Sequence, residues 1–138
     1  MKAVDTNVLA RFFVDDPDDP EAARQRPAAL AAMRGRVFVS ATVLLELEWV
    51  LRGFYELPPT AIHRALTALC SYGNVVIEDR AEVQAALQAY KAGLDFANAL
   101  HLLRASGCDA LLTFDKRLVK RAAAVPGTLP CELPVAGA

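Results

Sequence analysis

The sequence predicts an α/β fold in which helices cover both faces of a central, mainly parallel sheet of four to five strands. Short apolar segments bounded by turn residues alternate with longer segments of helical periodicity, and this alternation favours parallel strand pairing. The length of 138 residues suits one domain with a substantial core. Two apolar segments, 2–5 and 110–115, also end in an aspartate, which is typical of strand ends that line a binding crevice.

The first half of the chain is expected to contain two strands and three helices. In order, these are a strand at 2–5, a helix at 7–13, a helix from 20 to about 33, a strand at 36–39 and a helix at 40–54. Thr6 and Asn7 are the candidate caps of the first helix. Asp19-Pro20 predicts the start of the second, because proline is well accommodated in a first helical turn, whereas Pro27 is expected to interrupt that helix.

The second half is expected to contain four helices and two strands. In order, these are a helix at 60–71, a strand at 75–77, helices at 80–92 and 96–106, a strand at 110–113 and a helix at 116–124. Gly93 separates two of the helices. The proline- and glycine-rich segment 126–138 is expected to be a C-terminal tail with at most one edge strand, at 128–132, so residues 1–125 make up the predicted domain.

Composition limits the classes of function. The chain has 15 basic and 16 acidic residues, so any contact with nucleic acid must be a local basic patch. Its 54% hydrophobic content and mean hydropathy of +0.26 predict some apolar surface that another subunit or a partner covers. Three widely spaced cysteines indicate free thiols in a reducing compartment. Without a signal peptide or a long apolar segment, the protein is expected to be cytoplasmic, with no membrane contact.

Carboxylates after the strands are the first candidate functional residues. Asp5 follows the first strand and Asp115 follows the fourth. Because the carboxyl ends of parallel strands lie at one edge of a sheet, these two side chains could meet there and hold a metal ion. Each could instead be only the N-cap of the helix that follows it.

Glu46 is a third candidate, from the helix expected at 40–54. Glu48 has Arg52 four residues later, in the favourable order for a helical ion pair, whereas Glu46 has no such partner. A carboxylate among apolar neighbours is costly without a counter-charge, so Glu46 is predicted to be a metal ligand. The alternative is an edge residue that reaches water.

Asp95 and Asn98 open the helix expected at 96–106. The three-residue spacing puts both side chains on one face, where they could point into the crevice. The alternative is a structural role, with Asp95 as the N-cap and Asn98 as its capping-box partner.

Two further groups are candidates for binding RNA or a protein partner. The basic residues follow Asp115 at helical spacing or belong to the first helix: Lys116, Arg117, Lys120, Arg121 and Arg11. The aromatic residues lie near the end of the helix at 40–54: Trp49, Phe54 and Tyr55. The alternatives are a solvated helix face for the first group and core packing for the second.

Four segments resemble, in order and spacing, the motifs of PIN-domain ribonucleases, and more narrowly of the VapC toxins of bacterial toxin–antitoxin pairs. They are Asp5-Thr6-Asn7-Val8-Leu9, Thr42-Val43-Leu44-Leu45-Glu46-Leu47, Asp95-Phe96-Ala97-Asn98-Ala99-Leu100-His101 and Leu112-Thr113-Phe114-Asp115. The resemblance implies a three-layer α/β/α sandwich, and a magnesium- or manganese-dependent endoribonuclease that acts on an RNA such as tRNA or rRNA. It also implies inhibition by a VapB-type antitoxin, and a homodimer.

In this resemblance the metal ligands fall on Asp5, Glu46, position 98 and Asp115. The family typically has aspartate where this chain has Asn98, and an amide lacks the charge and one of the ligand oxygens of a carboxylate. Asn98 is therefore either an engineered inactivating change or a natural one for which Asp95 compensates. The alternative functions are a catalytically inactive PIN-fold binding module and a hydrolase of small phosphoesters.

Overall fold

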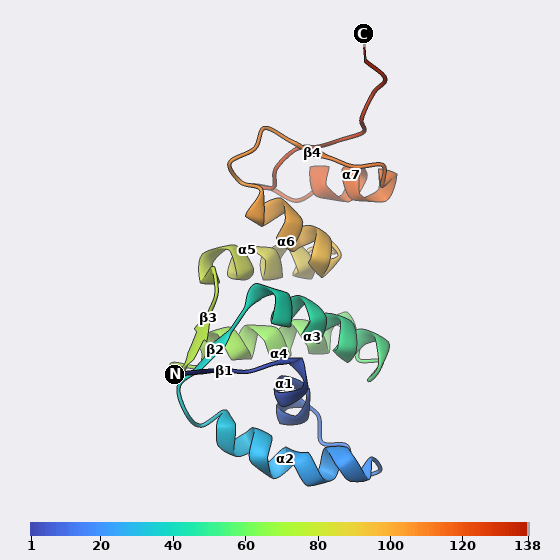
Figure 1. Cartoon of the computed structure of the whole chain (residues 1–138). Helices are drawn as coiled ribbons and strands as arrows, with labels where there is room; N and C mark the ends of the chain where they lie inside the picture. Colours follow the sequence, from blue (N-terminus) through green and yellow to red (C-terminus); the bar gives the residue numbers. More distant parts are fainter. Residues whose placement is uncertain (138) are drawn as a thin grey trace. The chain divides into compact units, whose positions relative to one another are not determined.

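The computed structural model describes residues 1–137, and the chain divides into two compact units that meet at Arg80 and Ala81 (Figure 1). The first unit contains β1 (Lys2–Ala3), α1 (Thr6–Phe13), α2 (Pro20–Ala32), β2 (Val37–Val39), α3 (Ala41–Gly53), α4 (Pro59–Ser71) and β3 (Val75–Ile77). The second contains α5 (Arg80–Lys91), which begins at the boundary, α6 (Phe96–Arg104), β4 (Leu111–Leu112), α7 (Lys116–Ala123) and β5 (Cys131–Glu132).

The first unit is built on a parallel three-stranded sheet in the order β1-β2-β3. Its strands are short, and Val37 of the central strand pairs with Lys2 on one side and Val75 on the other. Because all three strands run in the same direction, the residues that follow them lie at one edge of the sheet. Asp5 follows β1 at this edge, and Glu78, which follows β3, accepts a hydrogen bond from the backbone N–H of Ala41 at the start of α3 (3.0 Å).

Apolar stripes on α1, α3 and α4 form the core of this unit. α1 packs against α2 and α3, α3 packs against α4, and α4 packs against β3 (Figure 1). The largest fully buried aliphatic side chains come from these helices: Leu9, Leu44, Leu47, Leu51, Ile62, Leu66 and Leu69. Burial of this kind stabilises each helix by roughly 1.5–3 kcal/mol per large side chain relative to full exposure.

The second unit has its own parallel pair of strands. β4 pairs with β5 in the register Leu111↔Cys131, and α7 packs against β5. The hydroxyl of Thr128 donates to the carbonyl of Ala122 (2.9 Å) at the end of α7, which fixes the tail to that helix. Phe96 is fully buried, and its ring meets the ring of Tyr90 edge-on at 5.7 Å.

The expected helices and strands are all present, and most of the strands are shorter than expected. The tail contributes one strand, β5, at the end of the expected range 128–132. The five strands pair as one three-stranded and one two-stranded sheet. No helix within residues 1–137 is both long enough and apolar enough to cross a membrane.

The expected interruption at Pro27 is wrong, because α2 runs through this residue from Pro20 to Ala32. A proline inside a helix removes the N–H that would bond the carbonyl four residues earlier. Here that carbonyl belongs to Ala23, which is exposed, so water can satisfy it. The cost of the missing bond is thereby reduced, and the helix continues.

Candidate functional site

Each of the three motif aspartates caps the helix that follows it. Asp5 Oδ1 accepts from the N–H of Val8 (3.2 Å), and Asp95 Oδ2 accepts from the N–H of Asn98 (3.2 Å). Asp115 Oδ1 accepts from the N–H groups of two residues, at 3.0 and 3.1 Å. The capping interpretation is therefore confirmed for all three, and the prediction of Thr6 or Asn7 as the cap of the first helix is wrong, because Asp5 caps it.

Capping leaves these aspartates able to bind a ligand as well. Each cap uses one carboxylate oxygen, and the second oxygens of Asp5, Asp95 and Asp115 accept no hydrogen bond from any residue of the range 1–137. All three side chains are exposed. The cap also fixes the orientation of each carboxylate, so its second oxygen has a defined position.

The second unit brings the third and fourth motifs together around one cavity of about 230 Å³. Its lining combines two carboxylates, one amide, two guanidinium groups and two leucines: Asp95, Asn98, Asp115, Arg117, Arg121, Leu94 and Leu118. Leu94 and Leu118 are 3% and 5% exposed. The cavity thus has polar, charged walls beside a buried apolar base.

Asp5 lines a different cavity, of about 350 Å³, between α1 and α2 in the first unit. Arg11 and Gln25 lie on its wall, together with three alanines of α2. Arg11 donates to the hydroxyl of Tyr55 (2.8 Å) and to Oε1 of Gln25 (3.1 Å). These bonds link α1 to α2 and to the end of α3, so Arg11 has a structural role beside Asp5.

The prediction that Glu46 lies among apolar neighbours is wrong. Glu46 is exposed, and Glu48 is the buried carboxylate, at 2% exposure. The buried positions of α3 include 44, 47, 48 and 51, the spacing of a helix face directed at a core. The predicted pair with Arg52 is confirmed, with Nε donating to Glu48 Oε2 at 2.9 Å. The same spacing, applied to the sequence, would have assigned Glu46 to the outer face.

The four cations of α7 separate into two pairs. All four are exposed, but Arg117 and Arg121 line the cavity with Asp115, whereas Lys116 and Lys120 do not. Four residues turn an α-helix by a little over one full turn, so each pair shares a face. Helical spacing predicts pairs of cations one turn apart, and the buried side chains of Leu118 and Ala122 determine that the arginine pair is the one beside the cavity.

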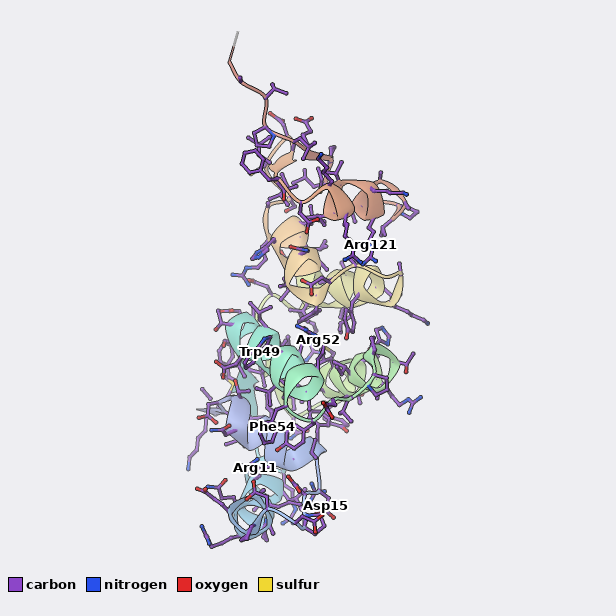
Figure 2. All side chains as sticks on the ribbon, turned by 90° about the vertical axis from the view of Figure 1, so that its right-hand side faces the viewer. Arg11, Asp15, Trp49, Arg52, Phe54 and Arg121 are labelled. Carbon is purple, nitrogen blue, oxygen red and sulfur yellow. The ribbon has the colours of Figure 1, made fainter. Side chains whose placement is uncertain are left out.

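Core packing is the wrong interpretation for two of the three aromatic candidates. Trp49 is 63% exposed and Phe54 is 68% exposed, and both belong to α3 or its C-cap (Figure 2). Tyr55 is half-buried, and its ring meets that of Phe54 edge-on at 4.9 Å. The first unit therefore exposes the Trp49 ring, and separately the packed rings of Phe54 and Tyr55.

No three aspartate, glutamate, histidine or cysteine side chains in the range 1–137 form a group that could hold a metal ion. Asp95, Asn98 and Asp115 line the same cavity in the second unit. Asp5 and Glu46 belong to the first unit, where Asp5 follows β1 and Glu46 lies on α3.

The fold is α/β with parallel strands, and its second unit holds carboxylates beside arginines in one cavity. A family model described as PIN domain matches residues 2–124, which is most of the chain and runs through both units. The chain therefore belongs to the PIN domain family. PIN domains are generally nucleases, and PIN nucleases typically use divalent metal ions. A search of curated proteins finds no match.

Proposed function

We propose that this protein is the toxin of a toxin–antitoxin pair, a VapC-type endoribonuclease that hydrolyses RNA phosphodiester bonds with Mg²⁺ or Mn²⁺ and is inhibited by a VapB-type antitoxin. Membership of the PIN domain family supports nuclease chemistry. The observation that carries the proposal furthest is the cavity in which Asp95, Asn98 and Asp115 face the same space as two arginines. Carboxylates and guanidinium groups in one cavity suit a phosphodiester and the cation that accompanies it.

The proposed metal ligands are Asp5, Glu46, Asp115 and Asn98, with Asp95 as a further oxygen donor. They fit Mg²⁺ or Mn²⁺ chemically, because every donor is a carboxylate or amide oxygen and hard cations prefer such oxygens. The second oxygens of the three capping aspartates strengthen this fit, since no residue of the range 1–137 donates to them. A bound cation would supply Lewis-acid stabilisation of the charge that develops on the phosphoryl oxygens.

The chain's own residues have distinct roles in this proposal. The aspartates are held by their helix N-termini, so they need little reorganisation on binding. Arg117 and Arg121 orient the phosphodiester, and Leu94 and Leu118 limit the access of water to the base of the cavity. Asn98 provides an oxygen in a position similar to that of an aspartate oxygen, but without the charge. The rate of RNA cleavage is therefore expected to be low in this chain.

The proposal also includes a three-layer α/β/α sandwich with a sheet of four to five strands. Every strand pair is parallel, and the family match runs from residue 2 to residue 124 as one domain-sized segment. The remaining residues of the chain would act as a tail to this domain. We further propose that the protein is cytoplasmic and forms a homodimer.

The proposed antitoxin contact consists of Trp49, Phe54 and Tyr55. Two of these rings are more than half exposed, and large exposed aromatic side chains are typical of protein–protein contacts. The proposed contacts to RNA are Lys116, Arg117, Lys120 and Arg121, with Arg11 beside Asp5. An amphipathic segment of the antitoxin would cover the aromatic surface.

Asn98 also favours a second candidate function, a binding module that has kept the fold and lost the chemistry. An experiment that distinguishes the ribonuclease from the binding module incubates the Asn98→Asp variant with total cellular RNA and either Mg²⁺ or EDTA. Discrete cleavage products that need Mg²⁺ support the ribonuclease. A folded variant that binds RNA and leaves it intact supports the binding module. A control that carries both Asn98→Asp and Glu46→Gln should remain inactive.

A further inference from the structure

We propose that the cavity between the start of α6 and α7 is a subsite for a single RNA backbone phosphate, held by Arg117 and Arg121, and that Lys116 and Lys120 lie outside it. This inference rests on the proposed ribonuclease function. Of the four cations of α7 that are proposed to contact RNA, it assigns two, on one face of the helix, to one defined ligand group.

The first support is the geometry of α7. The helix begins at its cap Asp115 and buries Leu118 and Ala122, which fixes its rotation about its own axis. Arg117 and Arg121 then share one face, one turn apart, and both line the cavity. Because the helix is anchored by buried side chains, the two guanidinium groups are presented to the cavity together.

The second support is that both guanidinium groups remain available for a ligand. Neither Arg117 nor Arg121 makes a salt bridge with any side chain of residues 1–137, although both lie beside Asp95 and Asp115 in the cavity lining. Arginine presents a planar set of donors that matches two phosphate oxygens at once. Two such groups one turn apart suit a phosphodiester, which offers two unesterified oxygens.

The size of the cavity limits what it can hold. Its volume of about 230 Å³ lies below the range of roughly 300–1,000 Å³ that is usual for pockets enclosing a whole small molecule. The lining contains no aromatic side chain on which a base could stack. A phosphate with part of its ribose therefore fits the cavity better than a nucleobase does.

The net charge of the cavity lining depends on the residue at position 98. The two arginines balance the two aspartates, and Asn98 adds no charge, so the lining is formally neutral. An aspartate at position 98 would leave one net negative charge, which repels phosphate unless a divalent cation is bound. We therefore expect Asn98→Asp to weaken RNA binding in EDTA and to regain it when Mg²⁺ is added.

The test is RNA binding in EDTA, where cleavage does not contribute. A short fluorescein-labelled single-stranded RNA is titrated with the protein, and fluorescence anisotropy gives Kd at several salt concentrations. The variant Arg117→Gln/Arg121→Gln is compared with Lys116→Gln/Lys120→Gln, which removes the same charge from the same helix. We expect the variant Arg117→Gln/Arg121→Gln to raise Kd by about tenfold or more. The slope of log Kd against log salt concentration should also fall by about 0.7, the value for one phosphate of a single strand that the protein no longer neutralises.

Lys116 and Lys120 are also proposed RNA contacts, so the lysine variant should raise Kd as well, but by less than about threefold, because these two charges do not line the cavity. A third variant, Arg117→Lys/Arg121→Lys, should bind with intermediate affinity because it keeps the charge and loses the paired donors. Circular dichroism verifies that each variant is folded.

Equal weakening by the arginine and lysine variants would overturn the inference, since α7 would then act as a uniform basic surface. The arginine substitutions are also combined with Asn98→Asp. If Asn98→Asp cleaves RNA with Mg²⁺ and the added arginine substitutions do not slow this cleavage, the inference is overturned and the proposed function stands. If the unaltered protein does not bind RNA and Asn98→Asp does not cleave it, the proposed function fails, and the inference fails with it.

Discussion

Asp115 shows how one side chain can have two roles that are separable by substitution. Its Oδ1 caps α7 through the N–H groups of Arg117 and Leu118, while its second oxygen is proposed to bind a metal ion. Asparagine caps a helix about as well as aspartate does, whereas alanine cannot. The cap therefore depends on shape and an oxygen, and the metal site depends on charge.

This separation leads to a prediction for Asp115→Asn and Asp115→Ala. The alanine variant should lose about 0.5–2 kcal/mol of stability, and the asparagine variant should lose much less. When each is combined with Asn98→Asp, both should lose at least about 10²-fold in RNA cleavage, the usual effect of removing one group that stabilises transition-state charge. Urea denaturation and a cleavage assay measure the two effects. If the asparagine variant still cleaves RNA at the full rate, Asp115 is only a cap.

Cys70 predicts how stability depends on alkaline pH. The residue is 4% exposed, and burial raises the pKa of its thiol above the ordinary value of 9.0, although the nearby charge of Arg80 opposes this shift. The folded state then holds the proton more tightly than the unfolded state does. Its contribution to stability is fully present below about pH 9 and is lost as the pH rises through the raised pKa.

Urea denaturation at pH 8 and at pH 10 tests this dependence. The free energy of unfolding should fall more steeply in the unaltered protein than in Cys70→Val, which has no thiol to ionise. Burial also raises the pKa of Cys131, and because that thiol is common to both proteins its contribution cancels. Equal slopes would show that Cys70 does not couple folding to pH.

At the scale of the element, α3 carries two glutamates with opposite environments. Glu46 faces solvent, and Glu48 is buried and paired with Arg52. The first is proposed to act in catalysis, and the second holds the helix in place. Because they lie two residues apart, each serves as the control for the other.

We therefore predict opposite effects for Glu46→Gln and Glu48→Gln. The first should change stability by less than about 0.5 kcal/mol, as at other exposed sites. The second should lose about 1–3 kcal/mol, because it weakens a charge-assisted bond at a buried position. In the Asn98→Asp background, Glu46→Gln should abolish cleavage. Retained cleavage would remove Glu46 from the proposed metal site, and an unchanged stability of Glu48→Gln would contradict its structural role.

The elements themselves were largely predictable because their signals are local. The aspartate caps, the proline at the start of α2 and the apolar periodicity of α4 and α5 depend on neighbouring residues alone. Pro27 was misjudged because the cost of a proline depends on whether water reaches the carbonyl it leaves without a donor. The surroundings of Glu46 were misjudged because nearby apolar residues were counted without regard to the helix face on which they lie.

At the scale of the whole molecule, strand pairing was the least predictable feature. A local pattern identifies a strand and does not identify its partner, because pairing depends on residues far apart in the chain. Asp95, Asn98 and Asp115 line one cavity because each lies at the start of a helix in the same unit, whereas Asp5 lines another cavity and Glu46 lines neither. The separation of the arginine and lysine pairs on α7 emerged only once the buried face of that helix was known.

The central claim is that the chain is a metal-dependent ribonuclease whose activity is limited by Asn98. The most direct measurement compares the RNA cleavage rate of the unaltered protein with that of Asn98→Asp, with Mg²⁺ and with EDTA. We predict that the variant cleaves at least about 10²-fold faster with Mg²⁺, because a charged ligand is restored, and that EDTA abolishes the activity of both. Equal rates with and without Mg²⁺, or a folded variant that does not cleave RNA, would contradict the claim.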